Sequence, residues 1–268
     1  MGIAFKLIRS LMDGVGALPL GFHYGCGRAL SWVAHHVFHY RENVVRTNVA
    51  RSFPDMTYSE VDQTVDKFYR HFGDIIAETI WFGGCKSYKR LNKQGIARVE
   101  GFEGVEKAYE EGKSVMVLFS HCGNWELIGG LFGYLGREYS WNLGNAKVVY
   151  KKLSSKTWDD VMSANRIAPC GECDCMLESA RVLRYAVSHK NDQVAYVFPT
   201  DQAPYKVAKA HRVKNFLNQK TVTMTGGAAL AKMLGMSVFV LGMPSEGRGH
   251  YIFRFEKICD DASEYSPE

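Results

Sequence analysis

The stretch VMVLFSHCGNWELIGG, residues 115–130, carries the strongest signal for the fold. Its first five residues, Val115 to Phe119, form a short apolar run that is typical of a buried strand. Gly123 gives the backbone the freedom that a tight turn needs, and Asn124 is a residue type that caps helices well. The stretch therefore predicts a strand, then a turn that contains His121, then a helix over 124–135.

The same alternation runs through the rest of the chain after residue 101. Strands are predicted at 115–119, 146–150, 194–198, 237–243 and 251–258, and helices at 103–111, 124–135, 155–166, 175–188 and 223–234. Short apolar strands that alternate with helices are typical of a parallel sheet covered on both faces. We therefore expect an α/β fold with a mostly parallel central sheet flanked by helices. In such sheets functional residues gather after the carboxyl ends of strands, where His121 and Asp201 lie.

The chain is predicted to have an N-terminal helical, membrane-associating segment, residues 1–54, and a catalytic domain, residues 55–268. The 268 residues are 46% hydrophobic, enough for one core. Residues 17–38 are long enough to span a membrane, but they contain Arg28, His35 and His36, so we interpret the segment as interfacial helices. Helices that only pack on the domain are the open alternative. Pro54 is expected to end one helix and Ser59 to cap the next.

The charge of the chain is modest in total and uneven in distribution. There are 33 basic and 28 acidic residues, a formal net charge of +5. Bases outnumber acids in residues 1–54, and residues 86–98 and 202–245 contain no acid. The last of these basic stretches holds Lys206, Lys209, Arg212, Lys214, Lys220 and Lys232. Such clusters suit an anionic membrane surface, where each base contributes about 1 kcal/mol. We expect no nucleic-acid partner, because no recognition-helix, zinc-finger or RNA-binding-sheet pattern accompanies them.

The cysteines indicate a reducing compartment. The chain has 7 Cys, an odd number, and lacks a secretory cleavage pattern, so we expect free thiols. The run CGECDC, residues 170–175, resembles half of a metal site. A structural zinc site uses four ligands, usually from two such pairs, and no second pair occurs in the sequence. We therefore expect loop thiols and no metal.

His121 and Glu126 form the candidate catalytic pair. Five helical steps of about 100° place two side chains about 140° apart, so the two cannot meet within one regular helix. They can meet if His121 lies in the turn and Glu126 in the first helical turn, where the helix dipole favours a carboxylate. Glu126 would then orient the imidazole as a general base. The alternative is a buried, hydrogen-bonded histidine beside an unrelated glutamate.

The segment HCGNWEL, residues 121–127, resembles the His-x4-Asp/Glu motif of membrane lipid acyltransferases, and most closely the form found in the bacterial lipid A biosynthesis (lauroyl/myristoyl) acyltransferases. The similarity extends over nearly the whole chain. Further segments that resemble the family are RTNVARSFPD (46–55), HFGDIIAETI (71–80), VEGFEGVEKAYEEGKSVMVLFSHCGNWEL (99–127), VVYKKLSSKTWDDVMSANR (148–166), VFPTDQ (197–202) and NFLNQKTVTMTGGAALAKMLGMSV (215–238).

Family membership would imply transfer of an acyl chain from a thioester to a hydroxyl of a lipid A precursor. The donor would be acyl carrier protein or acyl-CoA as co-substrate, and neither a cofactor nor a metal would be needed. His121 would act as the base and Glu126 would orient it, without an acyl-enzyme. The resemblance places the protein at the cytoplasmic face of the inner membrane, and we expect a monomer. Cys122 also allows a Cys-His nucleophile, but neighbouring residues at a strand end point apart.

The resemblance also suggests which residues bind substrate. Arg166 matches an arginine that contacts substrate phosphates, through the bidentate geometry of a guanidinium. Asp201 matches the family's strand-end aspartate, Lys151 stands where many members have arginine, and Asn124 belongs to the central motif. The alternatives are a surface arginine on a helix for Arg166 and a turn residue for Asp201.

Two departures from the family keep other functions open. The N-terminal segment is less apolar than the spanning helix of other members, and the chain stops at YSPE, residues 265–268, so we expect it to be truncated at its C-terminal end. One alternative function is acylation of another glycolipid or glycerolipid. The other is an inactive membrane-binding homologue, against which the joint presence of His121, Glu126, Arg166 and Asp201 argues.

Overall fold

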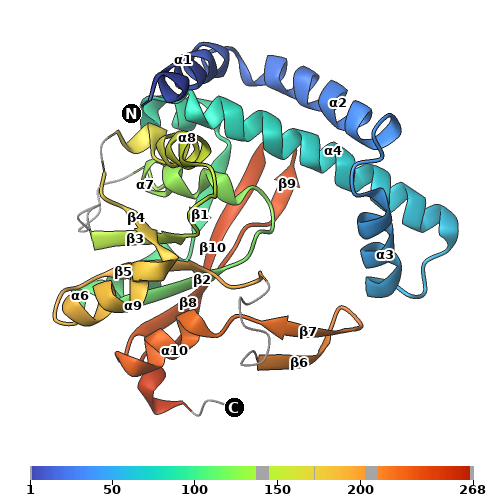
Figure 1. Cartoon of the computed structure of the whole chain (residues 1–268). Helices are drawn as coiled ribbons and strands as arrows, with labels where there is room; N and C mark the ends of the chain where they lie inside the picture. Colours follow the sequence, from blue (N-terminus) through green and yellow to red (C-terminus); the bar gives the residue numbers. More distant parts are fainter. Residues whose placement is uncertain (1, 137–144, 172, 203–210, 266–268) are drawn as a thin grey trace.

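The computed structural model has a central sheet between two layers of helices (Figure 1). It describes residues 2–136, 145–171, 173–202 and 211–265, with the backbone alone at 211–214; Lys206 and Lys209 of the predicted basic stretch therefore lie outside the described residues. The sheet strands are β1 (Ala97–Glu100), β2 (Val115–Phe119), β3 (Ala146–Tyr150), β4 (Met176–Glu178), β5 (Ala195–Pro199), β8 (Ser237–Gly242), β9 (Ser245–Gly247) and β10 (His250–Cys259).

The strand order is β1-β10-β8-β2-β5-β3-β4, with β9 added beside β10. The pairs β1/β10, β8/β2, β2/β5, β5/β3 and β3/β4 are parallel, whereas β10 runs antiparallel to β8 and to β9. A mostly parallel sheet flanked by helices is therefore confirmed. β2 and β5 lie side by side in a register that pairs Phe119 with Pro199, so the two strands end together.

The helices cover both faces of the sheet. They are α1 (Ile3–Gly16), α2 (Leu20–His36), α3 (Glu42–Ser52), α4 (Tyr58–Gly83), α5 (Tyr88–Gln94), α6 (Phe102–Glu110), α7 (Leu131–Tyr134), α8 (Lys156–Arg166), α9 (Val182–Ser188) and α10 (Gly226–Met233), with 3₁₀ turns at Trp125–Gly130, Ala168–Cys170, Ser179–Arg181 and Ala262–Glu264. Val115 and Val117 of β2 pack against α4, α6 and α7, whereas Met116 packs against α9 and α10. Because successive strand residues face opposite sides, β2 contributes to two cores and carries no solvent face.

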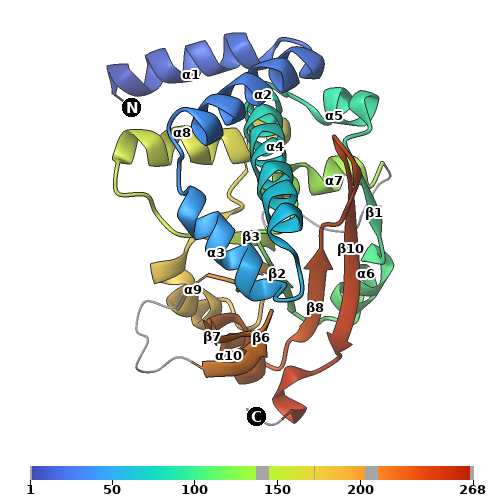
Figure 2. The same ribbon diagram turned by 90° about the vertical axis from the view of Figure 1, so that its right-hand side faces the viewer.

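The N-terminal helices pack along α4 (Figures 1 and 2). Gly27 of α2 and Gly73 of α4 let the two backbones approach closely, because a Cβ on either glycine would clash with the other's carbonyl oxygen. As predicted, the chain breaks around Pro54, but α4 is capped by Thr57 in a capping box with Glu60, and Ser59 lies inside the helix. Within the part of the chain that the structure describes, no helix is both long and apolar enough to cross a membrane.

Two of the predicted helices were wrong, and several strands were not predicted at all. Residues 124–135 form a 3₁₀ turn followed by the short α7, and Met176–Glu178 is a strand where a helix was expected. Strand β1 and a separate hairpin of β6 (His211–Phe216) and β7 (Gln219–Thr223) were not anticipated. These segments are only a few residues long, so their apolar spacing cannot separate one period from another.

Candidate active site

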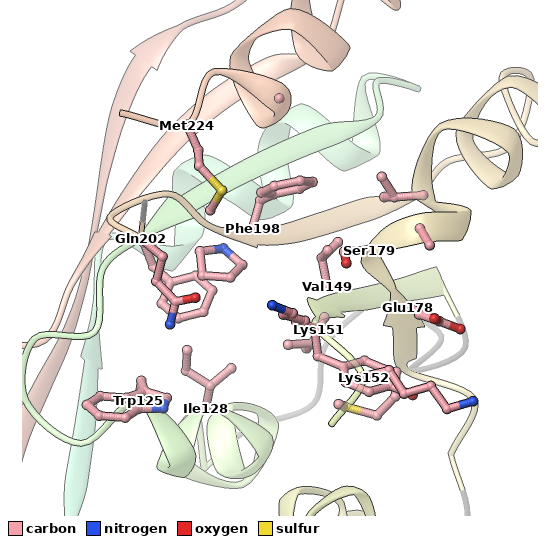
Figure 3. Close-up of a pocket in the computed structure, with 18 of the residues that line it drawn as sticks. Trp125, Ile128, Val149, Lys151, Lys152, Glu178, Ser179, Phe198, Gln202 and Met224 are labelled. Atoms are coloured by element: carbon pink, nitrogen blue, oxygen red, sulfur yellow. The ribbon is translucent and has the colours of Figure 1, made fainter. Parts of the chain in front are cut away.

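A cavity of about 980 Å³ opens at the carboxyl ends of β2, β3 and β5 (Figure 3). Its walls come from these strand ends and from the 3₁₀ turn after β2, the end of α8, and α10. Most of the lining is apolar, as with Ile128, Phe198 and Met224, and its polar side chains include the bases His121, Lys151, Lys152 and Arg166 and the acids Glu126 and Glu178. An apolar hollow with a few convergent polar groups is the usual form of a site for a largely apolar ligand.

His121 lies in the turn after β2, as predicted, and Asp201 holds it on two sides. Its Nδ1 lies 2.6 Å from Asp201 Oδ1, and its backbone N–H donates to Asp201 Oδ2 at 2.7 Å. Because a carboxylate only accepts, Nδ1 carries the proton and Nε2 is left with its lone pair. Gln202 Nε2 lies 3.1 Å from His121 Nε2, and the Trp125 ring meets the imidazole edge-on at 4.8 Å. The imidazole is thus fixed in orientation and tautomer.

The predicted hydrogen bond between His121 and Glu126 is wrong. Glu126 accepts from Nε and Nη2 of Arg166 at 2.7 and 2.8 Å and from Trp125 Nε1 at 3.2 Å, and none of the hydrogen bonds within the described residues joins it to His121. The physical reason has two parts. The guanidinium fork matches both carboxylate oxygens of Glu126, and the register of β2 with β5 already places Asp201 beside His121.

Arg166 and Glu126 form a partly buried ion pair in the cavity wall. The side chain of Glu126 is 8% exposed and that of Arg166 is 26% exposed. Burial alone would lower the pKa of Arg166, but the hydrogen bonds and charge of Glu126 outweigh it, and the pKa is raised. A guanidinium has five N–H groups, so donors remain for a ligand. Lys151 also lines the cavity, next to Lys152.

The family model described as "Bacterial lipid A biosynthesis acyltransferase" matches residues 3–263. The chain belongs to this family. It is therefore an acyltransferase, and the resemblance noted in the sequence is confirmed. Among the curated proteins no match to the chain is found.

In this lipid A acyltransferase, Asn124 does not lie where a substrate-binding residue would. Its side chain is 1% exposed, is absent from the described cavity lining, and makes no capping hydrogen bond. Its Nδ2 instead donates to Glu78 Oε2 at 2.9 Å. A buried amide bound to a second residue offers nothing to an incoming lipid, so the prediction that Asn124 binds substrate is withdrawn.

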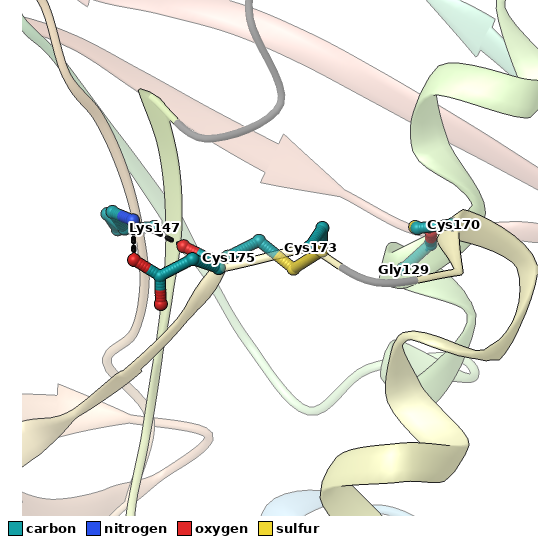
Figure 4. The surroundings of a disulfide bond; sticks show 6 residues. Gly129, Lys147, Cys170, Cys173 and Cys175 are labelled. Atoms are coloured by element: carbon teal, nitrogen blue, oxygen red, sulfur yellow. Dashed lines mark hydrogen bonds and ion pairs between the residues drawn. A yellow bond between two sulfur atoms is a disulfide. The ribbon is translucent and has the colours of Figure 1, made fainter.

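The acyltransferase has a disulfide where free thiols were expected. Cys173 and Cys175 are joined, and Cys175 lines the cavity (Figure 4). Between them, Asp174 binds the buried Lys147 of β3 through its carbonyl oxygen and through Oδ2, the latter at 3.0 Å. Cys170 donates to Gly129 O at 2.9 Å. The other five cysteines, including Cys170, carry free thiols, in agreement with the prediction for those positions.

Cys122 is the neighbour of the catalytic-site histidine, and we expect Cys122→Ala to keep acyl transfer within about twofold of wild type. Its side chain is exposed, and Cys122 is not among the residues that line the cavity. Surface substitutions of this kind usually change stability by less than about 0.5 kcal/mol. Steady-state rates of the variant test this. A loss of a hundredfold or more would revive the Cys-His nucleophile as the mechanism.

Proposed function

We propose that the protein transfers a fatty acyl chain from an acyl thioester, carried by acyl carrier protein, to a hydroxyl of a lipid A precursor. The observation that carries the proposal is the His121–Asp201 pair, whose histidine lines a largely apolar cavity, in a chain of the lipid A acyltransferase family. His121 is the general base and Asp201 its orienting carboxylate. The role first expected for Glu126 passes to Asp201.

The reaction follows from this pair. Nε2 of His121 removes the proton of the acceptor hydroxyl, whose oxygen attacks the thioester carbonyl; the C–S bond then breaks and the thiolate takes the proton from the imidazolium. Asp201 stabilises the imidazolium that forms in between. General base assistance contributes about 10²- to 10⁴-fold, and positioning of the two reactants contributes the remainder. This step uses no cofactor and no metal.

Two other features of the cavity support the choice of substrate. Its apolar lining suits a fatty acyl chain, because burying each CH₂ group away from water contributes about 0.8 kcal/mol of favourable free energy. Lys151, Lys152 and Arg166 also line it, and a guanidinium can contact a phosphate through two parallel hydrogen bonds. We propose that these cations face the phosphates of the lipid A precursor.

We also propose that residues 1–54 attach the enzyme to the cytoplasmic face of the inner membrane. Helix α1 places Ile3, Leu7 and Leu11 on one stripe at i, i+4 and i+8, and these side chains are 79%, 67% and 69% exposed. Its other side packs against α4, with Phe5 buried. A helix that is apolar on its outward face is suited to lie in the interface of a bilayer.

The test is transfer by the purified protein with defined substrates. Acyl carrier protein and coenzyme A thioesters are offered with a lipid A precursor as acceptor, and products are identified by mass spectrometry. We expect one added acyl chain on the lipid A precursor. Acylation of a glycerolipid alone would establish the alternative substrate, and no product with any acceptor would establish the inactive homologue.

A further inference from the structure

A second, polar hollow of about 340 Å³ lies between α2 and α4, among residues that the proposed reaction does not use. It is lined by Arg28, Ser31, Trp32, His35 and His36 of α2 and by Asp66, Tyr69 and Arg70 of α4. Residues 28, 32 and 36 follow one another at helical spacing, so they form one exposed stripe along α2, beside the residues that pack on α4. The hollow therefore lies where α2, which belongs to the N-terminal segment, packs on α4 of the domain.

Two arginines, Arg28 and Arg70, line this hollow. Within the described residues, neither the Arg28 nor the Arg70 guanidinium makes a hydrogen bond or an ion pair. Asp66, the acid in the lining, lies 3.5 Å from His35 Nδ1. His35 is buried, stacked on Tyr69 at 4.0 Å and on His36 at 4.3 Å. Two arginines against one acid leave the hollow with an excess of positive charge.

The ligand of this hollow could be a cation or an anion, and its lining residues decide between the two. His35, His36 and Asp66 offer ligand atoms that lie within 4.8 Å of one another, as a metal ion would require. However, Arg28 and Arg70 line the same hollow, and their charges repel a divalent cation and attract an anion. A guanidinium fork is also the group that best matches a phosphate. The charge balance therefore favours a phosphate.

We propose that the hollow between α2 and α4 binds the phosphate of a membrane phospholipid headgroup, Arg28 and Arg70 being its main contacts. The surroundings favour a bilayer over free phosphate: Trp32, which lines the hollow, is 58% exposed, and Val37 and Phe38 at the end of α2 are exposed as well. Tryptophan is enriched at the level of lipid headgroups. The proposal rests on the membrane attachment proposed above.

The test is cosedimentation of the full chain with vesicles of phosphatidylcholine, with and without phosphatidylglycerol. Loss of two bases near an anionic surface weakens binding by about 30-fold, and we expect this for Arg28→Gln/Arg70→Gln on phosphatidylglycerol vesicles. The matched control is Arg181→Gln/Arg184→Gln, which removes the same charge from the opposite face of the sheet and stays within about twofold of wild type. Equal binding by all three proteins overturns the proposal.

Other outcomes identify the source of an error. If wild type itself does not bind vesicles, both the proposed membrane attachment and the proposed headgroup site are wrong. The proposed reaction is tested separately, by acyl transfer to an acceptor dispersed in detergent, which needs no vesicle. If inorganic phosphate binds with the same affinity as the vesicles, the hollow is a site for free phosphate. Titration with Zn²⁺ that binds stoichiometrically, and is lost in His36→Ala, indicates a metal site.

A separate observation concerns Glu78 of α4, which is 0% exposed. It accepts hydrogen bonds from Tyr24 of α2 at 2.8 Å, from Asn124 of the catalytic turn at 2.9 Å and from Tyr251 of β10 at 2.8 Å. The carboxyl group of Glu78 thereby connects α4, α2 and β10 to the turn between His121 and the 3₁₀ segment. We infer that Glu78 is a positioning residue, which fixes this turn through Asn124.

Asn124→Ala and Glu78→Gln test this inference. Asn124→Ala cuts the link to the turn but leaves the bonds of Glu78 to both tyrosines, so we expect kcat to fall about tenfold or more while KM for the donor stays within about twofold. Glu78→Gln keeps a carbonyl oxygen for Asn124 and should retain most of kcat, whereas Glu78→Leu should not. Wild-type kcat in Asn124→Ala overturns the inference.

The pH dependence of stability gives a second readout. Burial raises the pKa of Glu78, and the hydrogen bonds from Asn124, Tyr251 and Tyr24 oppose it less strongly. Nearby, Asp74 raises it further and is itself paired with Arg248 at 3.1 Å. A group whose pKa is higher in the folded state stabilises the fold at pH values below its pKa in the unfolded state. This stability is lost as the pH rises through its pKa in the folded state. The stability of wild type relative to Glu78→Gln should therefore fall from acid to alkaline pH, and a flat difference would contradict the shift.

Discussion

Asp201→Asn is expected to lower kcat for acyl transfer by about 10²- to 10⁴-fold while the fold stays intact. In wild type the carboxylate accepts from His121 Nδ1 at 2.6 Å and from the backbone N–H of His121 at 2.7 Å. An asparagine of the same shape can present its N–H₂ group to Nδ1. The imidazole would then accept there, carry its proton on Nε2, and be unable to take the proton of the acceptor hydroxyl.

The measurement is single-turnover transfer by wild type and three variants. His121→Ala sets the floor, since it removes the base. Asp201→Asn should lie near that floor, and Glu126→Gln should lie well above it, because Glu126 bonds to Arg166 and Trp125. The opposite order, with Glu126→Gln near the floor and Asp201→Asn close to wild type, would show that Glu126 orients His121 during turnover and would restore our first prediction.

The strands that carry the site could be predicted from the sequence. Val115–Phe119 and Ala146–Tyr150 were predicted with the bounds that the structure has, because each is a short run, apolar except for Lys147, between polar turns. The positions of His121 and Asp201 just after apolar strands were visible as well. What the sequence does not contain is the order of strands in the sheet. Only the β2–β5 pairing shows that the two residues lie opposite each other.

The wrong carboxylate was predicted as the partner of His121 for a physical reason. Glu126 is five residues from His121 and Asp201 is eighty, so local spacing favoured the wrong carboxylate. Parallel neighbours in register bring residues that are distant in sequence to the same edge of the sheet: Phe119 pairs with Pro199, and two residues beyond them come His121 and Asp201. That equal offset from two strand ends was the signal that could have found the pair.

The buried polar contacts were out of reach of sequence reasoning. Glu78 lies on a helix, where a glutamate is ordinarily exposed, and only the packing of α2 and β10 around it shows that it is fully buried. Asn124 looked like a cap for the same reason: its residue type is typical of caps, and its burial depends on α4. In both cases a polar side chain serves a tertiary contact that local patterns do not record.

Arg166→Met is expected to destabilise the fold by about 3–5 kcal/mol. The substitution leaves the Glu126 carboxylate, which is 8% exposed, without the guanidinium that satisfies both of its oxygens at 2.7 and 2.8 Å. Removing one partner of a buried pair costs more than the pair itself contributes, because the remaining charge stays desolvated. The double variant Glu126→Leu/Arg166→Met has no such charge and should be more stable than Arg166→Met alone.

Urea unfolding of wild type, both single variants and the double variant closes this cycle, and Asp160→Ala provides the control on the same helix. Asp160 pairs with Lys156 at 3.1 Å, four residues earlier on α8, where the lysine is 84% exposed, and an i,i+4 pair of this kind contributes about 0.3–0.5 kcal/mol. If Arg166→Met cost no more than Asp160→Ala, or if the double variant were no more stable than Arg166→Met, the carboxylate would be solvated in the folded protein. The cavity would then be wet at Glu126. Conversely, a stable double variant with low kcat would show that the ion pair is kept for its cation at the cavity wall, since stability alone would favour apolar side chains at both positions.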